Sequence, residues 1–562
     1  MAPRFPLARS SIASISLASL LGAWACGSAA SSRPSDDSAA QAGAGGGGSG
    51  GGGGAFQPGG GAGGAPTVIP DPETCEQAAL GHTYVGCDFW PTVLDNIVRP
   101  DFDYAVVAAN AGAQPADVTV ERAGAKIGTV TVEPGGLVKM FLPWVPELKS
   151  VTSPLKGCPT DVKTATVNAK QGAYHVTSTR PIALYQFNAI EYQGKGGPGG
   201  KSWASCQTDT CGGQLKNKCF SYTNDASLLL PSTALTGAYR IAGPTAWQSV
   251  DDTSPTGGFI YPPYVAVTAT VDGTQVQVKL SATAAIAKGS GLPSIGPGGT
   301  ATFTLGRGDV ALLVGESAVG VDLSGSLVTA SAPVQVLSGI ACANVPADRV
   351  ACDHLEESVP PAETLGRRYF VTAPSGPGGA SMGHVVRLHG NVDGTKLTYP
   401  GFDPGGPATI DAGVTVDLGV VPADFEIVGD HEFLVASYQL GAGPTTGDQL
   451  GDPSQSLAVT VEQFRTRYVF LAPDDYDESY ADVVTPMTAT LTLDGVAITQ
   501  APVEISSGYG ALRVKLPPGK AGAHVLTSDV PVGLQVIGYG KYTSYQYPGG
   551  LNLGEIAPPP VK

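Results

Sequence analysis

The sequence predicts an all-β protein made of about four tandem immunoglobulin-like β-sandwich repeats, preceded by a disordered glycine-rich tether. Three observations support this fold class. The chain of 562 residues contains 77 glycines and 46 prolines, and only 14% of its residues are charged, which favours turns and short strands. No segment combines a sustained apolar period of 3.6 residues with helix caps. One set of short motifs recurs along the chain in the same order.

The first 25 residues have the pattern of a secretory signal peptide. Arg4 and Arg9 precede an apolar run at 12–25, which is shorter than the about 20 residues that a membrane-spanning helix needs. The run ends in LLGAWAC and resembles the lipobox of bacterial lipoproteins, so Cys26 is the expected site of lipid attachment. Cleavage by ordinary signal peptidase, which would give a secreted soluble protein, is the alternative.

Residues 26–70 are predicted to form a disordered linker. They include QAGAGGGGSGGGGGAFQPGGGAGGAP, which has too few apolar side chains to build a core. Such a segment would tether a folded body to a membrane. Because Gly27 follows Cys26, where lipoproteins retained at the inner membrane have aspartate, we expect an exported protein anchored at the outer membrane or cell surface.

Each repeat begins with a predicted start strand that carries a tyrosine. PSTALTGAYRIAGP, PAETLGRRYFVTAP and TVEQFRTRYVFLAP align on Tyr239, Tyr369 and Tyr468, and each ends in proline. The stretch TYVGCDFWP, with Tyr84, is a degenerate fourth copy. The recurring start strand is therefore one landmark of an internal repeat.

Two further motifs recur downstream of the start strands. Asp-Gly between alternating apolar residues, as in VAVTATVDGTQVQV, indicates a β-hairpin. VTSTRPIALYQF, VTASAPVQVLSG and LTSDVPVGLQVI, which we call return strands, each have threonine four residues before proline, and IVGDHEFLVASY keeps only the pattern. A unit of about 100 residues suits a sandwich better than a propeller blade of about 40 to 50. A single closed propeller-like β repeat array is the alternative.

These landmarks divide the chain after the linker. The expected β modules are 71–223, which contains Cys-rich insertions, 224–350, 351–455 and 456–562.

Eight cysteines remain after Cys26, an even number that favours disulfides in an oxidising compartment. Cys75 and Cys87 flank a short stretch, and so do Cys342 and Cys352, which makes each a candidate pair. The cysteines whose pairing stays open are Cys158, Cys206, Cys211 and Cys219. Their spacing lacks the paired CxxC of a zinc site, so disulfides are preferred over a metal.

The stretch CDHLEE at 352–357 places a thiol, an imidazole and three carboxylates close together in sequence. Asp353, Glu356 and Glu357 are therefore weak candidates for cation ligands. Because the stretch falls at the boundary between two predicted modules, a structural role is preferred over cation binding. In that role, Cys342 and Cys352 clamp the last strand of one module to the first of the next, and Asp353 and Glu356 accept backbone hydrogen bonds.

Several function classes are disfavoured. The chain contains no HExxH or P-loop motif, and GxSxG and GxGxxG are matched only within the glycine-rich stretches 43–64, 194–199 and 376–383, so we expect neither an enzyme nor a cofactor. A formal charge of −16 argues against nucleic acid as a partner, because phosphate binding needs clustered cations. The acidic run at 473–482 lacks the spacing of a calcium loop. Contact with a membrane is expected only through the N-terminal lipid.

Four segments together resemble one family. CDHLEESVPPAETLGRRY, TYVGCDFWPTVLDN, FDYAVVAANAG and ALYQFNAIEY resemble the IgGFc-binding protein N-terminal domain family. The resemblance implies an extracellular β-rich recognition module without assigned catalytic residues. We therefore expect a non-enzymatic cell-surface lipoprotein that acts in adhesion or recognition of an extracellular protein or glycan. A structural component of the envelope or extracellular matrix is the alternative.

Overall fold

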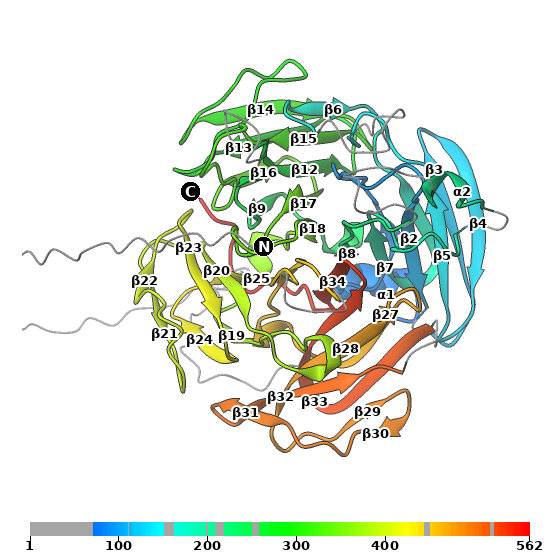
Figure 1. Cartoon of the computed structure of the whole chain (residues 1–562), viewed down its shortest axis with the longest axis vertical. Coiled ribbons are helices and arrows are strands. Elements are labelled where there is room, and N and C mark those ends of the chain that lie inside the picture. The colour runs from blue at the N-terminus through cyan, green and yellow to red at the C-terminus, as the bar shows by residue number, and fades with distance from the viewer. Residues whose placement is uncertain are drawn as a thin grey trace, which may run out of the picture. The chain divides into compact units, whose positions relative to one another are not determined.

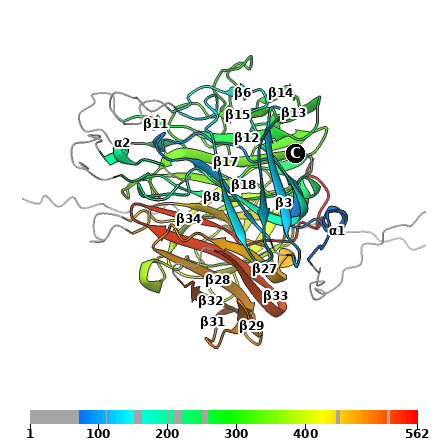
Figure 2. The same ribbon diagram turned by 90° about the vertical axis from the view of Figure 1, so that its right-hand side faces the viewer.

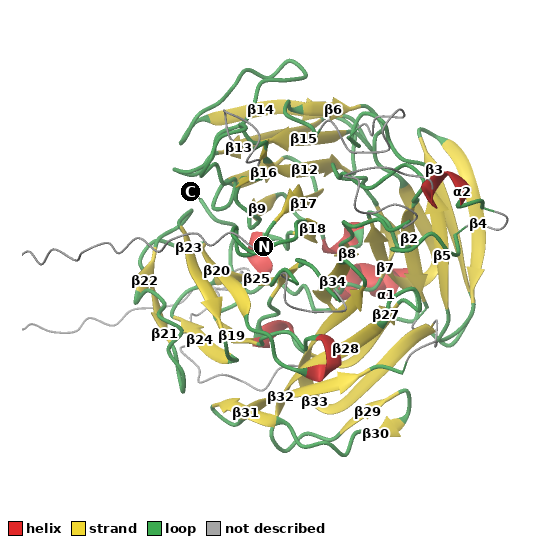
Figure 3. Ribbon diagram, in the orientation of Figure 1, coloured by secondary structure: helices red, strands yellow, loops and turns green. Residues whose placement is uncertain are grey.

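Strands and loops make up almost all of the computed structural model (Figures 1 and 3), which describes residues 71–110, 112–150, 162–197, 201–207, 219–249, 258–442, 450–517 and 522–561. All of these residues belong to the unit Ala65–Lys562. The prediction of an all-β fold is therefore confirmed. The predicted signal peptide and linker, with Cys26, lie outside the described residues.

Within the described residues, the strands form four repeats, and each repeat has two sheets with the same strand order. The first sheet contains the start strand, the first part of the return strand and two further strands. The second sheet contains the second part of the return strand, and its edge is the last strand of the repeat, which we call the inner strand. The chain therefore crosses between the two sheets several times in every repeat.

The elements of the repeats have the following bounds. Repeat 1 has a first sheet of β1 (Gly86–Phe89), β7 (His175–Phe187), β3 (Ala116–Arg122) and β4 (Ala125–Val132), and a second sheet of β8 (Ala226–Leu229), β7 again, β2 (Tyr104–Ala109) and β5 (Leu137–Leu142). Repeat 2 has β9 (Ala238–Arg240), β16 (Leu327–Ala330), β13 (Thr274–Lys279) and β14 (Thr300–Leu305), then β18 (Asp353–Ser358), β17 (Val334–Ala343), β12 (Pro263–Ala269) and β15 (Val310–Val314). Repeat 3 has β19 (Arg368–Val371), β24 (Phe425–Gly429), β21 (Thr395–Thr398) and β22 (Thr409–Ile410), then β26 (Gln455–Leu457), β25 (Phe433–Gln439), β20 (His384–Gly390) and β23 (Thr415–Val421). Repeat 4 has β27 (Arg465–Ala472), β33 (Gly522–Gly540), β29 (Leu491–Leu493) and β30 (Val496–Ala497), then β34 (Thr543–Pro548), β33 again, β28 (Glu478–Pro486), β32 (Tyr509–Lys515) and β31 (Val503–Ser506).

The remaining elements are short. They are α1 (Cys75–Gly81), α2 (Ala204–Gln207), β6 (Val167–Ala169), which pairs with β15, the hairpin of β10 (Trp247–Gln248) and β11 (Ile260–Tyr261), and the 3-10 turns Ser232–Ala234, Ala362–Thr364, Pro377–Gly379 and Val461–Gln463.

The inner strands close the repeats around a common centre (Figure 1). Strand β8 lies beside β18, β18 beside β26, β26 beside β34, and β34 beside β8. This closed arrangement is propeller-like, which is the alternative expected from the sequence. Each repeat nevertheless has two packed sheets in place of a single blade, and an immunoglobulin-like strand topology stays a prediction.

Both faces of the central strand of the second sheet are buried, as β12 of repeat 2 illustrates. Val265 and Val267 of β12 share a buried cluster with Val276 of β13 in the first sheet of the same repeat. Tyr264 and Ala266, on the opposite face of β12, belong to a cluster with repeat 1. Strands buried on both faces read as continuous apolar runs, because no face is left for polar side chains.

The start-strand tyrosine and the return strand recur together because they bind each other. The Tyr239 hydroxyl donates to the Val334 carbonyl at 2.6 Å and accepts from the Thr236 amide at 3.1 Å. The Tyr369 hydroxyl likewise donates to the Phe433 carbonyl at 2.6 Å. Tyr468 makes the equivalent bond to Val532. In repeats 2 and 4, the residue whose carbonyl accepts this bond directly follows the proline of the return-strand motif. Phe433 holds the same place in repeat 3, whose motif lacks the proline.

The first repeat departs from the sequence alignment. Phe89 pairs with Val176 in the register in which Tyr239 pairs with Val328, so Phe89 and not Tyr84 occupies the tyrosine position. The Tyr84 hydroxyl instead donates to the Val469 carbonyl at 3.2 Å and accepts from its amide at 3.0 Å. Tyr84 therefore joins the start of the described chain to repeat 4.

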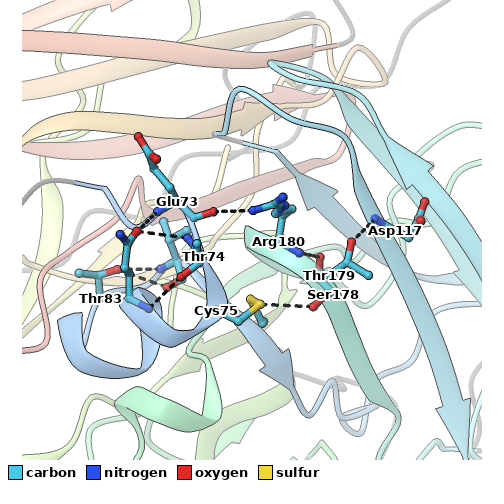
Figure 4. Close-up of a disulfide and its surroundings, with 11 residues drawn as sticks. Glu73, Thr74, Cys75, Thr83, Asp117, Ser178, Thr179 and Arg180 are labelled. Atoms are coloured by element: carbon cyan, nitrogen blue, oxygen red, sulfur yellow. Dashed lines mark hydrogen bonds between the residues drawn. A yellow bond between two sulfur atoms is a disulfide. The ribbon is translucent and has the colours of Figure 1, made fainter.

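Segments from both ends of the described chain complete this junction. Thr83 pairs with Asn552, and the Leu553 amide donates to the His82 carbonyl at 2.7 Å. Asp71 forms ion pairs with two arginines of β27. Figure 4 shows the neighbouring helix, where the Arg180 guanidinium reaches the Glu73 carbonyl at 3.4 Å. These contacts hold repeat 1 against repeat 4.

The Asp-Gly turns correct a second expectation. The turn at 494–495 is a hairpin between β29 and β30, because both Asp494 and Gly495 have positive φ, as a type I′ turn requires. The turn at 272–273 has positive φ only at Gly273, and the chain passes there from β12 in the second sheet to β13 in the first. The predicted hairpin across VDGT is therefore wrong.

The repeats also end one strand later than the predicted module boundaries. The inner strand of each repeat pairs with the return strand that precedes it, so β8 and β18 belong to repeats 1 and 2. The boundaries placed after 223 and 350 exclude these strands, and the boundary after 455 divides β26. The reason is that the start-strand signature begins only after the inner strand has ended.

Candidate functional site

One end of the unit, which we call the loop face, is formed by the connections that lead into the inner strands. These connections are 188–197 with 219–225, 343–352, 439–442 with 450–454, and 540–542. Figure 2 shows α2 and β11 towards this end and α1 towards the opposite end. Because loops carried on a rigid scaffold commonly bear function, the loop face is the candidate site.

Backbone contacts hold these connections together across the repeats. The Gly441 amide of repeat 3 donates to the Val345 carbonyl of repeat 2 at 2.8 Å. The Gly451 amide of repeat 3 donates to the Gly540 carbonyl of repeat 4 at 3.0 Å. The connections of repeats 2, 3 and 4 therefore adjoin one another on this face.

The described residues contain three disulfides. Cys342–Cys352 and Cys206–Cys219 both lie on the loop face, each with a Cα–Cα distance of 5.3 Å, and Cys75–Cys87 lies at the helix α1. The bond between Cys342 and Cys352 joins β17 to the residue before β18, within one sheet of repeat 2. The expected clamp between two modules is therefore wrong. Cys158 and Cys211 lie outside the described residues.

Cavities open on this face at equivalent places. The proline that ends the start-strand motif lines each of them. Pro244 lines a cleft of about 330 Å³ between repeats 2 and 3. Pro374 lines a cleft of about 350 Å³ between repeats 3 and 4, and Pro473 lines a small cavity of about 20 Å³ in repeat 4. The two larger clefts fall within the size range of small-molecule sites.

The carboxylates of CDHLEE lie buried at the centre and not on the loop face. Glu356 accepts hydrogen bonds from Gln186 Nε2 at 3.1 Å and from the Ser227 hydroxyl at 2.9 Å, and its other oxygen lies 3.0 Å from His354 Nε2. The expectation that Glu356 accepts backbone hydrogen bonds is therefore wrong. Its carboxylate binds side chains of repeat 1, because β18 lies directly beside β8.

Asp353 and Glu357 point to the other face of β18. Asp353 accepts from the His354 amide at 2.9 Å and from the Thr543 hydroxyl at 3.2 Å, so part of the expected backbone bonding is present. Glu357 accepts from the Ser358 amide at 2.8 Å. Burial raises the pKa of both carboxyls well above the usual range.

These carboxylates do not converge as metal ligands. Alternate residues of a strand face opposite ways, which separates Glu356 from Asp353 and Glu357. No group of three or more His, Cys, Asp or Glu side chains among the described residues is arranged to hold a metal ion. The centre is best interpreted as a polar junction between repeats.

Asp225 belongs to this junction and was not singled out from the sequence. One of its carboxylate oxygens accepts from the Glu356 amide and the Gln455 amide, both at 3.1 Å, so it links repeats 1, 2 and 3. Burial raises its pKa well above the usual range. The signal that could have identified it is an aspartate at the edge of an apolar strand, in the segment TNDASLLLP that precedes the start strand of repeat 2.

The histidines of β20 are also buried. Burial lowers the pKa of His384 and of His389 to about 3, so both are neutral near pH 7. Their Nδ1 atoms lie 2.7 Å from the Ser437 hydroxyl and 3.0 Å from the Thr415 hydroxyl. Both side chains are fully buried.

Comparison with known proteins assigns the chain to a family of binding proteins. Residues 225–538, more than half of the chain, match the family model described as IgGFc binding protein. The chain belongs to the IgGFc-binding protein family, and the resemblance inferred from its motifs is confirmed. The match begins at the junction aspartate and ends within β33, so it covers the inner strand of repeat 1, all of repeats 2 and 3, and repeat 4 without its inner strand.

A relative and two solved structures were also found. The IgGFc-binding protein of Homo sapiens is 27% identical over 245 residues, which are 43% of this chain and 4% of that protein. The chain therefore matches only a small part of its human relative. An anti-sigma factor domain-containing protein from Clostridium clariflavum is 12% identical over 54% of this chain and 88% of its own, with a TM-score of 0.11. A second anti-sigma factor domain-containing protein is 11% identical. The match covers 53% of this chain and 92% of that protein, with a TM-score of 0.09. Likenesses at these scores carry no argument.

The part of the chain that the structure describes contains no helix that is long and apolar enough to span a membrane.

Proposed function

We propose that this protein is a non-enzymatic recognition or adhesion module that binds an extracellular protein or glycan through the loop face. The observation that carries the proposal is the loop face itself, where clefts and disulfide-closed loops from neighbouring repeats adjoin on a closed scaffold. A rigid scaffold lowers the entropic cost of binding, because its loops need little ordering when a partner arrives.

Two observations support an exported protein that binds a partner. Disulfides persist in oxidising compartments, and the described residues contain three of them. The family and the human relative are both named for IgGFc binding. We further propose that Cys26 carries the lipid that anchors the chain at the outer membrane or cell surface.

The absence of catalysis is part of the proposal. The titratable groups at the centre, such as Glu356 and Asp225, are enclosed and bonded to other side chains or amides. A catalytic acid or base needs to reach a substrate proton within hydrogen-bond distance, which these groups do not do.

Exposed apolar side chains give a direct test. Val350 on the loop face is 59% exposed, Phe259, which precedes β11 at the same end of the unit, is 46% exposed, and Leu80 in α1 at the opposite end is 83% exposed. Phe259→Glu and Val350→Glu place a charge on the proposed binding surface, and Leu80→Glu is the matched control. The purified full chain would be tested by surface plasmon resonance against an IgG Fc fragment, a mucin and a bacterial extracellular polysaccharide.

We expect saturable binding to at least one of these probes. Both loop-face variants should weaken it about tenfold or more, because a buried unpaired charge opposes association. The control should bind like the wild type. If no probe binds, or if all three variants behave alike, the loop face is not the recognition surface.

A further inference from the structure

Three ionisable side chains from separate segments of repeat 1 meet at the loop face. Asp103 lies directly before β2, Glu191 lies in the connection that follows β7, and Lys201 lies three residues before α2. The Lys201 ammonium forms an ion pair with Oδ2 of Asp103. Because Cγ of Asp103 is one bond beyond that oxygen, Lys201 Nζ lies within about 4 Å of the carboxyl carbon.

Aromatic rings hold the Lys201–Asp103 pair against an apolar cluster. The Lys201 ammonium lies 4.3 Å from the centroid of the Trp203 ring, and this ring packs on Phe102 with centroids 5.0 Å apart. Phe102 and Trp203 share a buried cluster with the two cysteines of the Cys206–Cys219 disulfide. The side chains of Lys201 and Asp103 are only 16% and 30% exposed. The pair is therefore fixed in position and mostly shielded from water.

A third carboxyl group lies beside this pair without a partner of its own. Glu191 is 2% exposed, and neither of its oxygens makes a hydrogen bond to another described residue. Oε1 of Glu191 and Cδ of Lys201 each lie 2.9 Å from the point where a β-carbon on Gly197 would stand, so these two atoms are less than about 6 Å apart. Burial raises the pKa of Glu191 to about 7, and the charges of Lys201 and Asp103 both act on it. Near neutral pH, Glu191 can therefore both donate and accept a proton.

An ordinary ion pair does not need a second acid. Lys170 and Asp309 form such a pair, with Nζ 2.7 Å from Oδ2, but Lys170 is 69% exposed and the Asp309 carboxylate also accepts from two backbone amides. Burying Glu191 without a hydrogen-bond partner costs free energy, which an ion pair alone does not explain. An amine, a carboxyl group and a proton donor, held together away from water, are the groups that amide formation requires.

We propose that an intramolecular isopeptide bond joins Nζ of Lys201 to Cγ of Asp103, with Glu191 as the proton relay that forms it. This inference goes beyond the proposed recognition function and does not rest on it.

The reaction converts the ion pair into an amide and one water molecule. The Lys201 ammonium first gives a proton to the Asp103 carboxylate, which leaves a neutral amine and a neutral carboxyl group. The amine nitrogen then attacks Cγ, and a C–N bond forms. Glu191 donates its proton to the departing oxygen, which leaves as water, and receives one proton from the nitrogen. Glu191 ends as it began, and the balance needs no oxidant, reductant or co-reactant.

The fixed geometry makes this reaction feasible. Holding two reacting groups in contact can correspond to an effective concentration of about 10⁵ to 10⁸ M. Shielding from water also favours the neutral amine and the neutral carboxyl group over their charged forms. The bond would join positions 98 residues apart and would tie the segment of α2, with its disulfide, to the start of β2.

Peptide mapping of the full chain tests the bond directly. The reduced wild-type protein would be digested with a lysine-specific protease and chymotrypsin and analysed by mass spectrometry. We expect a branched peptide that contains Lys201 and Asp103, with a mass about 18 Da below the sum of its two parts, and no cleavage after Lys201. Lys170 and Asp309 are the internal control and should appear in separate peptides, because no unpartnered acid lies beside them.

Two variants separate the bond from the ion pair. Lys201→Arg keeps a positive charge beside Asp103 but removes the amine, so the branched peptide should be absent. Glu191→Gln keeps the size of the side chain but removes the proton relay, so the linked fraction should fall at least about tenfold. Both variants should keep the circular dichroism spectrum of the wild type, which shows that the fold is retained.

Three outcomes would overturn the proposal. The first is that Lys201 and Asp103 of the wild type appear in separate peptides, which requires no variant to interpret. The second is that Glu191→Gln is linked as completely as the wild type. The third is a link between Lys170 and Asp309 as well, which would show that contact alone selects the site. Binding of the Fc fragment, the mucin or the polysaccharide is a separate measurement, so the recognition function can stand when the isopeptide bond fails.

Discussion

Removing the hydroxyl of a start-strand tyrosine should destabilise the protein by more than most surface changes do. In Tyr239→Phe, the Val334 carbonyl loses its donor at 2.6 Å and the Thr236 amide loses its acceptor at 3.1 Å. Each lost hydrogen bond costs about 0.5 to 1.5 kcal/mol, and a buried group left unsatisfied costs more. We therefore expect a loss of about 2 to 4 kcal/mol in the free energy of unfolding.

Urea denaturation followed by tryptophan fluorescence would measure this loss. Tyr369→Phe and Tyr468→Phe should show losses of similar size, because their hydroxyls make the same bonds. Tyr476→Phe is the reference, since its hydroxyl makes no hydrogen bond within the described residues. It should change stability by about 0.5 kcal/mol or less. Equal effects in all variants would refute the idea that this contact is what the repeated motif preserves.

Three further predictions concern Asp452, a buried aspartate in the loop-face segment 450–454, a disulfide and the N-terminus. Burial raises the pKa of Asp452 to about 7, whereas an unfolded aspartate has a pKa of about 3.9. The contribution of Asp452 to the free energy of unfolding therefore falls as the pH rises from about 4 to about 7, and it is constant above about pH 7. Asp452→Asn should therefore gain stability relative to the wild type between pH 5 and pH 8, by up to about 4 kcal/mol, and a pH-independent difference in urea unfolding would argue against this. Replacing Cys342 and Cys352 together by serine should cost about 2 to 3 kcal/mol, and non-reduced peptide mapping of the wild type should show the two cysteines linked. Mass spectrometry of the mature N-terminus should show acylation of Cys26, and Cys26→Ser should release the chain into the medium; an unmodified cysteine would contradict the lipid anchor.

The sequence predicted those features of the fold that depend on local contacts. The tyrosine and the return-strand motif were both visible because they face each other within one repeat. The first repeat was misaligned because Phe89 packs in place of tyrosine, while Tyr84 nearby serves a different contact. A motif search cannot distinguish these roles, since both residues are aromatic and lie five positions apart.

Features that depend on closure of the repeats could not be derived from local pattern. The propeller-like arrangement requires β34 to lie beside β8, more than 300 residues away along the chain. The cleft between repeats 2 and 3 requires residues from separate segments of the chain to converge. The carboxylates of CDHLEE looked like a ligand set because they are close in sequence, yet strand alternation points them to opposite faces.

The most direct test of the recognition role is hydrogen–deuterium exchange of the full chain with and without a saturating extracellular ligand found in the binding assays. We predict that new protection falls on the loop face, at 188–197, 343–352, 439–442 and 540–542. Protection confined to the opposite end, at α1 and 551–561, or no change in any described segment, would contradict the account.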